Sequence, residues 1–66
     1  MTLLELISGL KNKNISVKVV DKDSDTEIIT FMSQGIAGVE GDVSARNVYK
    51  WEINGATSIT VVLEAA

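Results

Sequence analysis

Three aspartates at alternate positions, Asp21, Asp23 and Asp25, are the first residues in this sequence whose spacing could support chemistry. The spacing matches the first three side-chain ligands of an EF-hand loop, where carboxylate oxygens converge on calcium. The rest of that loop is missing, because Thr26 stands where it needs glycine and Met32 where it needs a bidentate glutamate. We therefore interpret the segment as a solvated hairpin loop. A calcium-binding module is the alternative.

Three glycines, Gly35, Gly38 and Gly41, repeat at a spacing of three residues and invite comparison with phosphate-binding loops. Nucleotide-binding loops follow G-x-G-x-x-G or G-x-x-x-x-G-K-[ST], and neither pattern occurs here. A G-x-x-G clamp on single-stranded nucleic acid needs basic neighbours, whereas Glu40 and Asp42 flank the last glycine. The segment is predicted to be a connector, and a nucleic-acid-binding module is again only the alternative.

The side chains most used in catalysis and zinc binding are missing, because the chain has no histidine and no cysteine. A disulfide and the usual Cys/His zinc site are thereby excluded. The remaining Asp, Glu, Lys and Ser residues form no recognisable constellation for acid–base or nucleophilic catalysis. We predict that the protein is not an enzyme, with no catalytic, cofactor-binding or metal-binding residues and no small-molecule ligand.

The composition is that of a small acidic domain. The chain has 66 residues, of which 45% are hydrophobic, and a net charge of −3, so a single domain over 1–66 is expected. The basic residues are scattered, which disfavours a nucleic-acid backbone or an anionic membrane as partner. No secretory signal or membrane span is recognisable, and the lack of cysteine fits a reducing compartment. We expect a cytoplasmic protein.

A helix is predicted from Thr2 to Asn12, because Thr2 and Glu5 match a capping box and leucines follow at helical spacing. Alternation and β-branched residues predict four strands, over 15–20, 27–32, 48–53 and 59–63. A helical turn capped by Asp42 precedes the third strand. The predicted fold class is α+β, with the N-terminal helix packed on a four-stranded antiparallel sheet in an α-β-β-β-β meander.

The alternation also predicts register, because opposed residues in an antiparallel pair share a face. In the first hairpin Val17 should oppose Phe31, and Val19 should oppose Ile29. In the second hairpin the pattern favours a loop of three or five residues over a two-residue turn at Asn54-Gly55. The predicted core contains Leu3, Leu6, Ile7, Leu10, Ile15, Val17, Val19, Ile29, Phe31, Tyr49, Trp51, Ile53, Ile59, Val61 and Leu63.

The second face of the sheet is predicted to be an interaction surface. The same alternation of side chains places five apolar residues on this face, with Val20 opposite Ile28. They are Val20, Ile28, Met32, Val48 and Val62. A contiguous exposed apolar patch usually marks such a surface. We expect it to bind another protein or a second copy of the chain as a homodimer. The alternative is that the connector from Gly35 to Val43 covers this face within the monomer.

The Leu-rich helix is followed by KNKNISVKVVD, and the chain closes with NVYKWEINGATSITVVLE. This layout resembles small uncharacterised proteins encoded by bacteriophages and prophages of low-GC Gram-positive bacteria. Such proteins are often of unknown function, and we expect a non-enzymatic protein that binds another protein. The opening LISGLKNKNISVKV is similar to one type of anti-CRISPR protein, which implies, as an alternative, inhibition of a host defence nuclease. Those inhibitors are more acidic than this chain, and no functional residue carries over from them.

Overall fold

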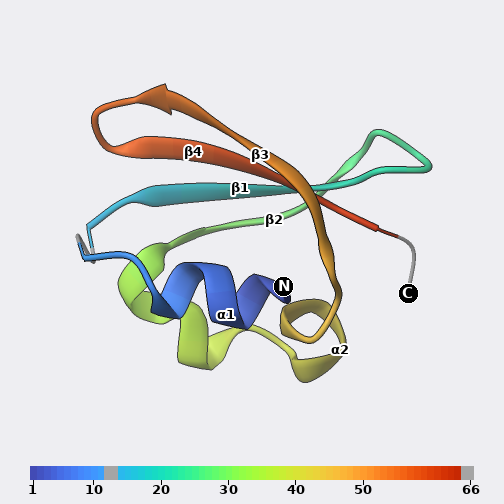
Figure 1. Ribbon diagram of the computed structural model, residues 1–66, viewed down its shortest axis with the longest axis horizontal. Coiled ribbons are helices and arrows are strands. Elements are labelled where there is room, and N and C mark those ends of the chain that lie inside the picture. Colours follow the sequence, from blue (N-terminus) through green and yellow to red (C-terminus); the bar gives the residue numbers. More distant parts are fainter. Residues whose placement is uncertain (12–13, 65–66) are drawn as a thin grey trace.

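A four-stranded sheet carries all the helical segments of the described chain on one face (Figure 1). The computed structural model describes residues 1–11 and 14–64. In chain order the elements are α1 (Leu3–Ser8), β1 (Ser16–Asp21), β2 (Glu27–Met32), the 3-10 helix η1 (Ser33–Gly38), α2 (Gly41–Ser44), β3 (Val48–Gly55) and β4 (Ser58–Leu63). The predicted α+β class, with a short N-terminal helix and four strands, is confirmed.

Helix α1 begins as predicted and ends earlier. The Thr2 hydroxyl accepts a hydrogen bond from the Glu5 N–H at 3.2 Å, and the Glu5 carboxylate accepts one from the Thr2 N–H at 2.9 Å. The hydrogen bond from the Thr2 N–H is the main cause that lowers the pKa of the Glu5 carboxyl. The helix ends at Ser8 with Gly9 as its C-cap, because glycine is a poor helix former. The predicted end at Asn12 lies outside the described residues.

The sheet is mixed, and the predicted antiparallel meander is wrong. Its strand order is β2-β1-β4-β3, with the two central strands, β1 and β4, running parallel. Two antiparallel hairpins, β1–β2 and β3–β4, therefore lie side by side and meet through their inner strands. Figure 1 shows β1 and β4 adjacent between the outer strands.

The connector between the hairpins explains this order. A meander requires a short turn between β2 and β3, whereas η1, α2 and their flanking residues separate them here. This connector packs against α1 and the core, with Ile36 and Val43 contacting the core cluster. It therefore lies on the helix face and does not cover the second face. The predicted helical turn is present as α2, but its N-cap is Glu40, with no side-chain cap from Asp42.

Both outer strands contain β-bulges, which insert one extra residue opposite the neighbouring strand. In β2 the extra residue is Ile28, since Val19 pairs with Ile29 and Val20 with Glu27. The predicted pairs of Val19 with Ile29 and of Val17 with Phe31 are confirmed, and the predicted pairing of Val20 with Ile28 is wrong.

The outer strand β3 contains two such bulges, at Tyr49 and at Asn54. Between them Ile53 pairs with Ile59, and beyond the second bulge Gly55 pairs with Ser58. Strand β3 ends at Gly55 and β4 begins at Ser58, so the turn consists of Ala56 and Thr57, and the predicted loop of three or five residues is wrong. The prediction that Asn54-Gly55 does not form the two-residue turn is confirmed, because both residues belong to β3. Because bulges disrupt the regular ladder, they protect both sheet edges from pairing with other chains.

The core lies between α1, β1 and β4. The buried residues common to the prediction are Leu3, Ile7, Val17, Val19, Ile59, Val61 and Leu63, with Leu6, Leu10, Ile15, Ile29 and Phe31 packed at its margin. The prediction is wrong for Tyr49, Trp51 and Ile53, which are 51%, 49% and 78% exposed. They lie on the outer strand β3, whereas the short helix α1 packs over the central strands.

Candidate functional site

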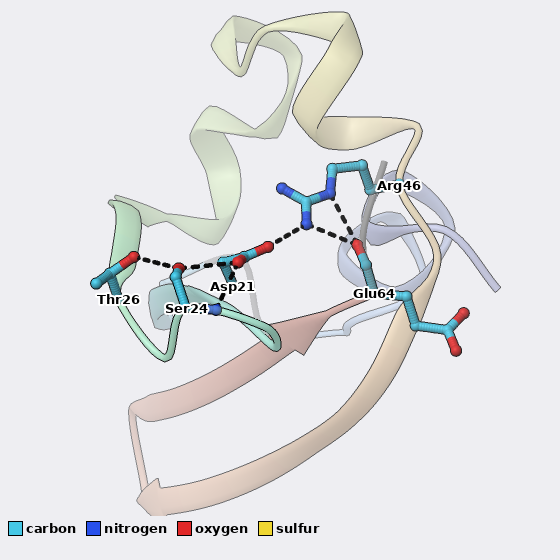
Figure 2. A network of polar contacts seen from close by, with 5 residues as sticks. All are labelled: Asp21, Ser24, Thr26, Arg46 and Glu64. Atoms are coloured by element: carbon cyan, nitrogen blue, oxygen red, sulfur yellow. Dashed lines mark hydrogen bonds and ion pairs between the residues drawn. The ribbon is translucent and has the colours of Figure 1, made fainter.

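A polar network joins the ends of β1 and β4 to the segment after α2 (Figure 2). The Arg46 guanidinium donates to the Asp21 carboxylate at 2.5 Å and to the Glu64 backbone carbonyl at 2.6 and 2.9 Å. The other Asp21 oxygen accepts from the N–H and the hydroxyl of Ser24, at 2.9 and 2.8 Å. The Ser24 hydroxyl also lies 2.6 Å from that of Thr26. Together these contacts connect the first hairpin loop, through Asp21 and Arg46, to the residue after β4.

This network lowers the pKa of the Asp21 carboxyl from 3.8 to about 2, chiefly through the Arg46 hydrogen bond and then through those from Ser24. The backbone of Arg46 also accepts a hydrogen bond from the Leu3 N–H at 3.1 Å. One residue therefore fastens the start of α1, the end of β1 and the residue after β4 together. We interpret the network as structural.

The aspartate loop is organised by these contacts and not around a cation position. The Asp21 carboxylate is engaged by Arg46 and Ser24, and Asp25 adopts a left-handed backbone conformation with φ 55°, which aspartate tolerates in turns. Within residues 1–11 and 14–64, no three acidic side chains are placed to share a metal ion. The loop geometry supports the hairpin-loop interpretation.

The repeating glycines form part of the connector. Gly35 and Gly38 lie in η1, and Gly41 begins α2. A Cβ atom added to any of the three would meet no other atom within 4 Å, and none of them has positive φ. Neither close approach of another part of the described chain nor a left-handed backbone conformation therefore requires glycine at these positions.

The structure brings only part of the predicted interaction surface together. Val20 and Val62 are neighbours on the central strands and line a hollow on the second face. Met32, at the end of β2, is 42% exposed. Ile28 and Val48 are wrongly assigned to this surface, because both pack against the core on the helix face. The bulges at Ile28 and Tyr49 cause this, since an extra residue reverses the alternation of faces along the strand.

Lysines gather on this second face. Lys18 and Lys22 from the first hairpin and Lys50 from β3 line the hollow of about 550 Å³ above Val20 and Val62. We call this surface the lysine face. The sequence prediction described the basic residues as scattered. The alternate positions 18, 20 and 22 already indicate that Lys18, Val20 and Lys22 share one face of a strand.

The helix face contains a second hollow, the α1–β3 groove. It has a volume of about 160 Å³ and is lined by Leu6, Leu10, Ile15, Trp51, Ile53, Gly55, Ala56, Ser58 and Ile59. Leu6 and Leu10 form the side toward α1, and the half-exposed Trp51 and the exposed Ile53 form the side toward the sheet edge. Sequence reasoning assigned these residues to the core and so missed the groove.

Comparisons with protein-family models, with curated proteins and with solved structures found no match to this chain. None of the helices within residues 1–11 and 14–64 has the length and apolar content needed to cross a lipid bilayer. The candidate surfaces are therefore argued from their geometry alone.

Proposed function

We propose that this protein is a non-enzymatic domain that acts by binding another protein, and that the α1–β3 groove receives one apolar side chain of that partner. The observation that carries the proposal is the exposure of Trp51 and Ile53, at 49% and 78%, beside an apolar groove. Single exposed apolar residues are common on protein surfaces. Here these two residues lie on one side of an outer strand and line the groove together with Leu6 of α1 and Leu10 just after it, so the apolar surface is continuous.

The size of the groove supports this occupant. At about 160 Å³ it is close to the volume of apolar cavities, roughly 150 Å³, that accommodate benzene. One Leu, Ile, Met or Phe side chain therefore suits it. Tryptophan is also among the residues most enriched at the energetic centres of protein interfaces.

The resemblance to phage proteins suggests that a host defence nuclease could be one partner of this kind. Direct mimicry of DNA is not favoured, because Lys18, Lys22 and Lys50 occupy the open face of the sheet. Binding through an apolar groove fits a protein–protein contact with such an enzyme, and with any other protein that presents an apolar side chain.

Photo-cross-linking from position 51 tests the proposal. With p-benzoylphenylalanine in place of Trp51, we expect one specific cross-linked protein that does not form when the same probe replaces Gln34, an exposed residue of η1 that lines neither hollow. The identified protein is then purified, and its affinity is measured by calorimetry. Ile53→Glu should weaken binding at least tenfold, because it places a charge in the groove, whereas Gln34→Glu should leave binding within twofold.

Three outcomes contradict the proposal. The first is the absence of a product specific to position 51. The second is a partner that binds Ile53→Glu as tightly as the wild type. The third is self-association in sedimentation experiments that Ile53→Glu abolishes, which would make the occupant a second copy of this chain.

A further inference from the structure

The lysine face has cations that form no ion pair within the described chain. Lys18, Lys22 and Lys50 are exposed, and within the described chain the one ion pair joins Arg46 to Asp21. The Lys22 ammonium lies 4.3 Å from the centre of the Tyr49 ring. Three lysines therefore surround one hollow, although the chain as a whole has a net charge of −3.

From this arrangement we propose that the lysine face is a second binding surface, distinct from the α1–β3 groove, and that it takes an acidic polypeptide segment of a partner protein. The carboxylates of the segment contact Lys18, Lys22 and Lys50, and its backbone crosses the sheet above Val62. Charge complementarity of this kind accelerates association and selects partners.

The shape of the surface favours a polypeptide over a small ligand. The lining residues come from β1, β3, β4 and the first hairpin loop, and no element of the described chain lies over them. Pockets for small molecules enclose most of the ligand surface. A one-sided hollow of about 550 Å³ instead suits an extended segment that keeps one side in water.

The other groups in the hollow favour a polypeptide over a nucleic acid. Glu52 and Asp25 line the same hollow, and their carboxylates would repel the phosphate groups of a nucleic acid, which has one at every nucleotide. Surfaces that bind single strands stack the bases on aromatic rings, whereas the Tyr49 ring already contacts the Lys22 ammonium. An acidic polypeptide also brings backbone N–H groups, which can donate hydrogen bonds to these two carboxylates.

The test uses a ten-residue peptide of alternating Glu and Ser, a matched peptide of alternating Gln and Ser, and a ten-nucleotide oligothymidine. Binding is followed by amide chemical shifts of the ¹⁵N-labelled full chain. We expect the Glu peptide to shift the amides of Lys18, Lys50 and Val62, and the Gln peptide to leave them in place. The affinity for the Glu peptide should fall at least threefold between 50 and 300 mM salt, because exposed charges are screened.

Variants separate this surface from general charge effects. The double change Lys18→Gln with Lys50→Gln should weaken Glu-peptide binding at least fivefold. Lys11→Gln removes an exposed lysine that does not line this hollow and should change binding less than twofold. All of these side chains are exposed, so the variants should keep the wild-type circular dichroism spectrum.

The proposal is overturned if the Gln peptide binds equally well, if Lys11→Gln is as damaging as the double variant, or if no shift appears at millimolar Glu peptide. Tighter binding of oligothymidine than of the Glu peptide would reassign the face to nucleic acid. Ile53→Glu lies on the opposite face and should leave peptide binding unchanged, so failure here is distinguishable from failure of the groove proposal.

Discussion

Neighbouring valines on β4 offer the sharpest test of which sheet face is core. Val61 is fully buried on the helix face, between Val19 on β1 and Trp51 on β3. Val62 is partly exposed and lines the hollow of the lysine face. Threonine has nearly the shape of valine and is equally suited to strands. Changing each valine to threonine therefore alters polarity on one face at a time.

The expected cost differs strongly between the two positions. At Val61 the new hydroxyl is buried among apolar side chains, and an unsatisfied buried polar group costs about 1–3 kcal/mol. The lost methyl burial adds about 0.8 kcal/mol, so we predict about 2–4 kcal/mol for Val61→Thr. At Val62 water can reach the hydroxyl, and the cost should stay below about 0.5 kcal/mol.

Urea denaturation followed by Trp51 fluorescence measures both values. With a slope of about 1 kcal/mol per molar urea for a small domain, Val61→Thr should lower the midpoint by about 2–4 M and Val62→Thr by less than about 0.5 M. Equal shifts for the two variants, or a larger shift for Val62→Thr, would refute the assignment of the faces.

The remaining predictions concern the polar network and α1. The depressed pKa of Asp21, about 2 against 3.8, means that its contact with Arg46 contributes stability above about pH 4 that is lost as the pH falls through 2. The difference in urea midpoint between the wild type and Asp21→Asn should therefore be smaller at pH 2 than at pH 4. A difference that stays constant over this range would contradict the prediction. Thr2→Ala removes the N-cap shared with Glu5 and should cost about 1 kcal/mol in urea denaturation, whereas no change would mean that the cap contributes nothing. Gly9→Ala should raise the free energy of unfolding by about 0.4–1 kcal/mol, because Gly9 has helical φ and a Cβ there makes only ordinary contacts; a lower thermal midpoint would contradict it.

Local features of the fold could be predicted from the sequence. The capping box at Thr2 and Glu5 and the bounds of β2 depend on neighbouring residues, and both are confirmed. The register of the regular part of the first hairpin also follows from alternation, as the pairs Val17–Phe31 and Val19–Ile29 show. In each case the deciding interactions lie within a few residues or across one turn.

The strand order could not be derived from alternation alone. A two-residue repeat of apolar side chains shows which face of the sheet each side chain occupies, but not which strands are adjacent. One signal was present. Val19-Val20 in β1 and Val61-Val62 in β4 place apolar residues on both faces, as is typical of central and parallel strands. The outer strand β3 instead alternates Lys50 and Glu52 with its large residues. Weighing this contrast would have placed β1 and β4 in the centre.

The candidate surfaces were mispredicted because of the bulges. A bulge shifts every later residue to the other face, and no residue type marks Ile28 or Tyr49 as the extra one. Val48 consequently joins the core, and Tyr49 contacts Lys22 on the lysine face. The exposure of Trp51 follows from the strand order, since a six-residue helix cannot cover an outer strand as well as the central pair.

The parallel pairing of β1 with β4 also has a consequence for how the chain folds. Each hairpin closes through residues near in sequence, which takes about 1–10 μs. Ser16 pairs with Ser58, and Val20 with Val62, so the central contact closes only after the whole intervening chain has been arranged. Distant pairing of this kind slows folding. The meeting of the two hairpins is therefore the slow step, and substitutions between β1 and β4 should retard folding more than equally destabilising ones within either turn.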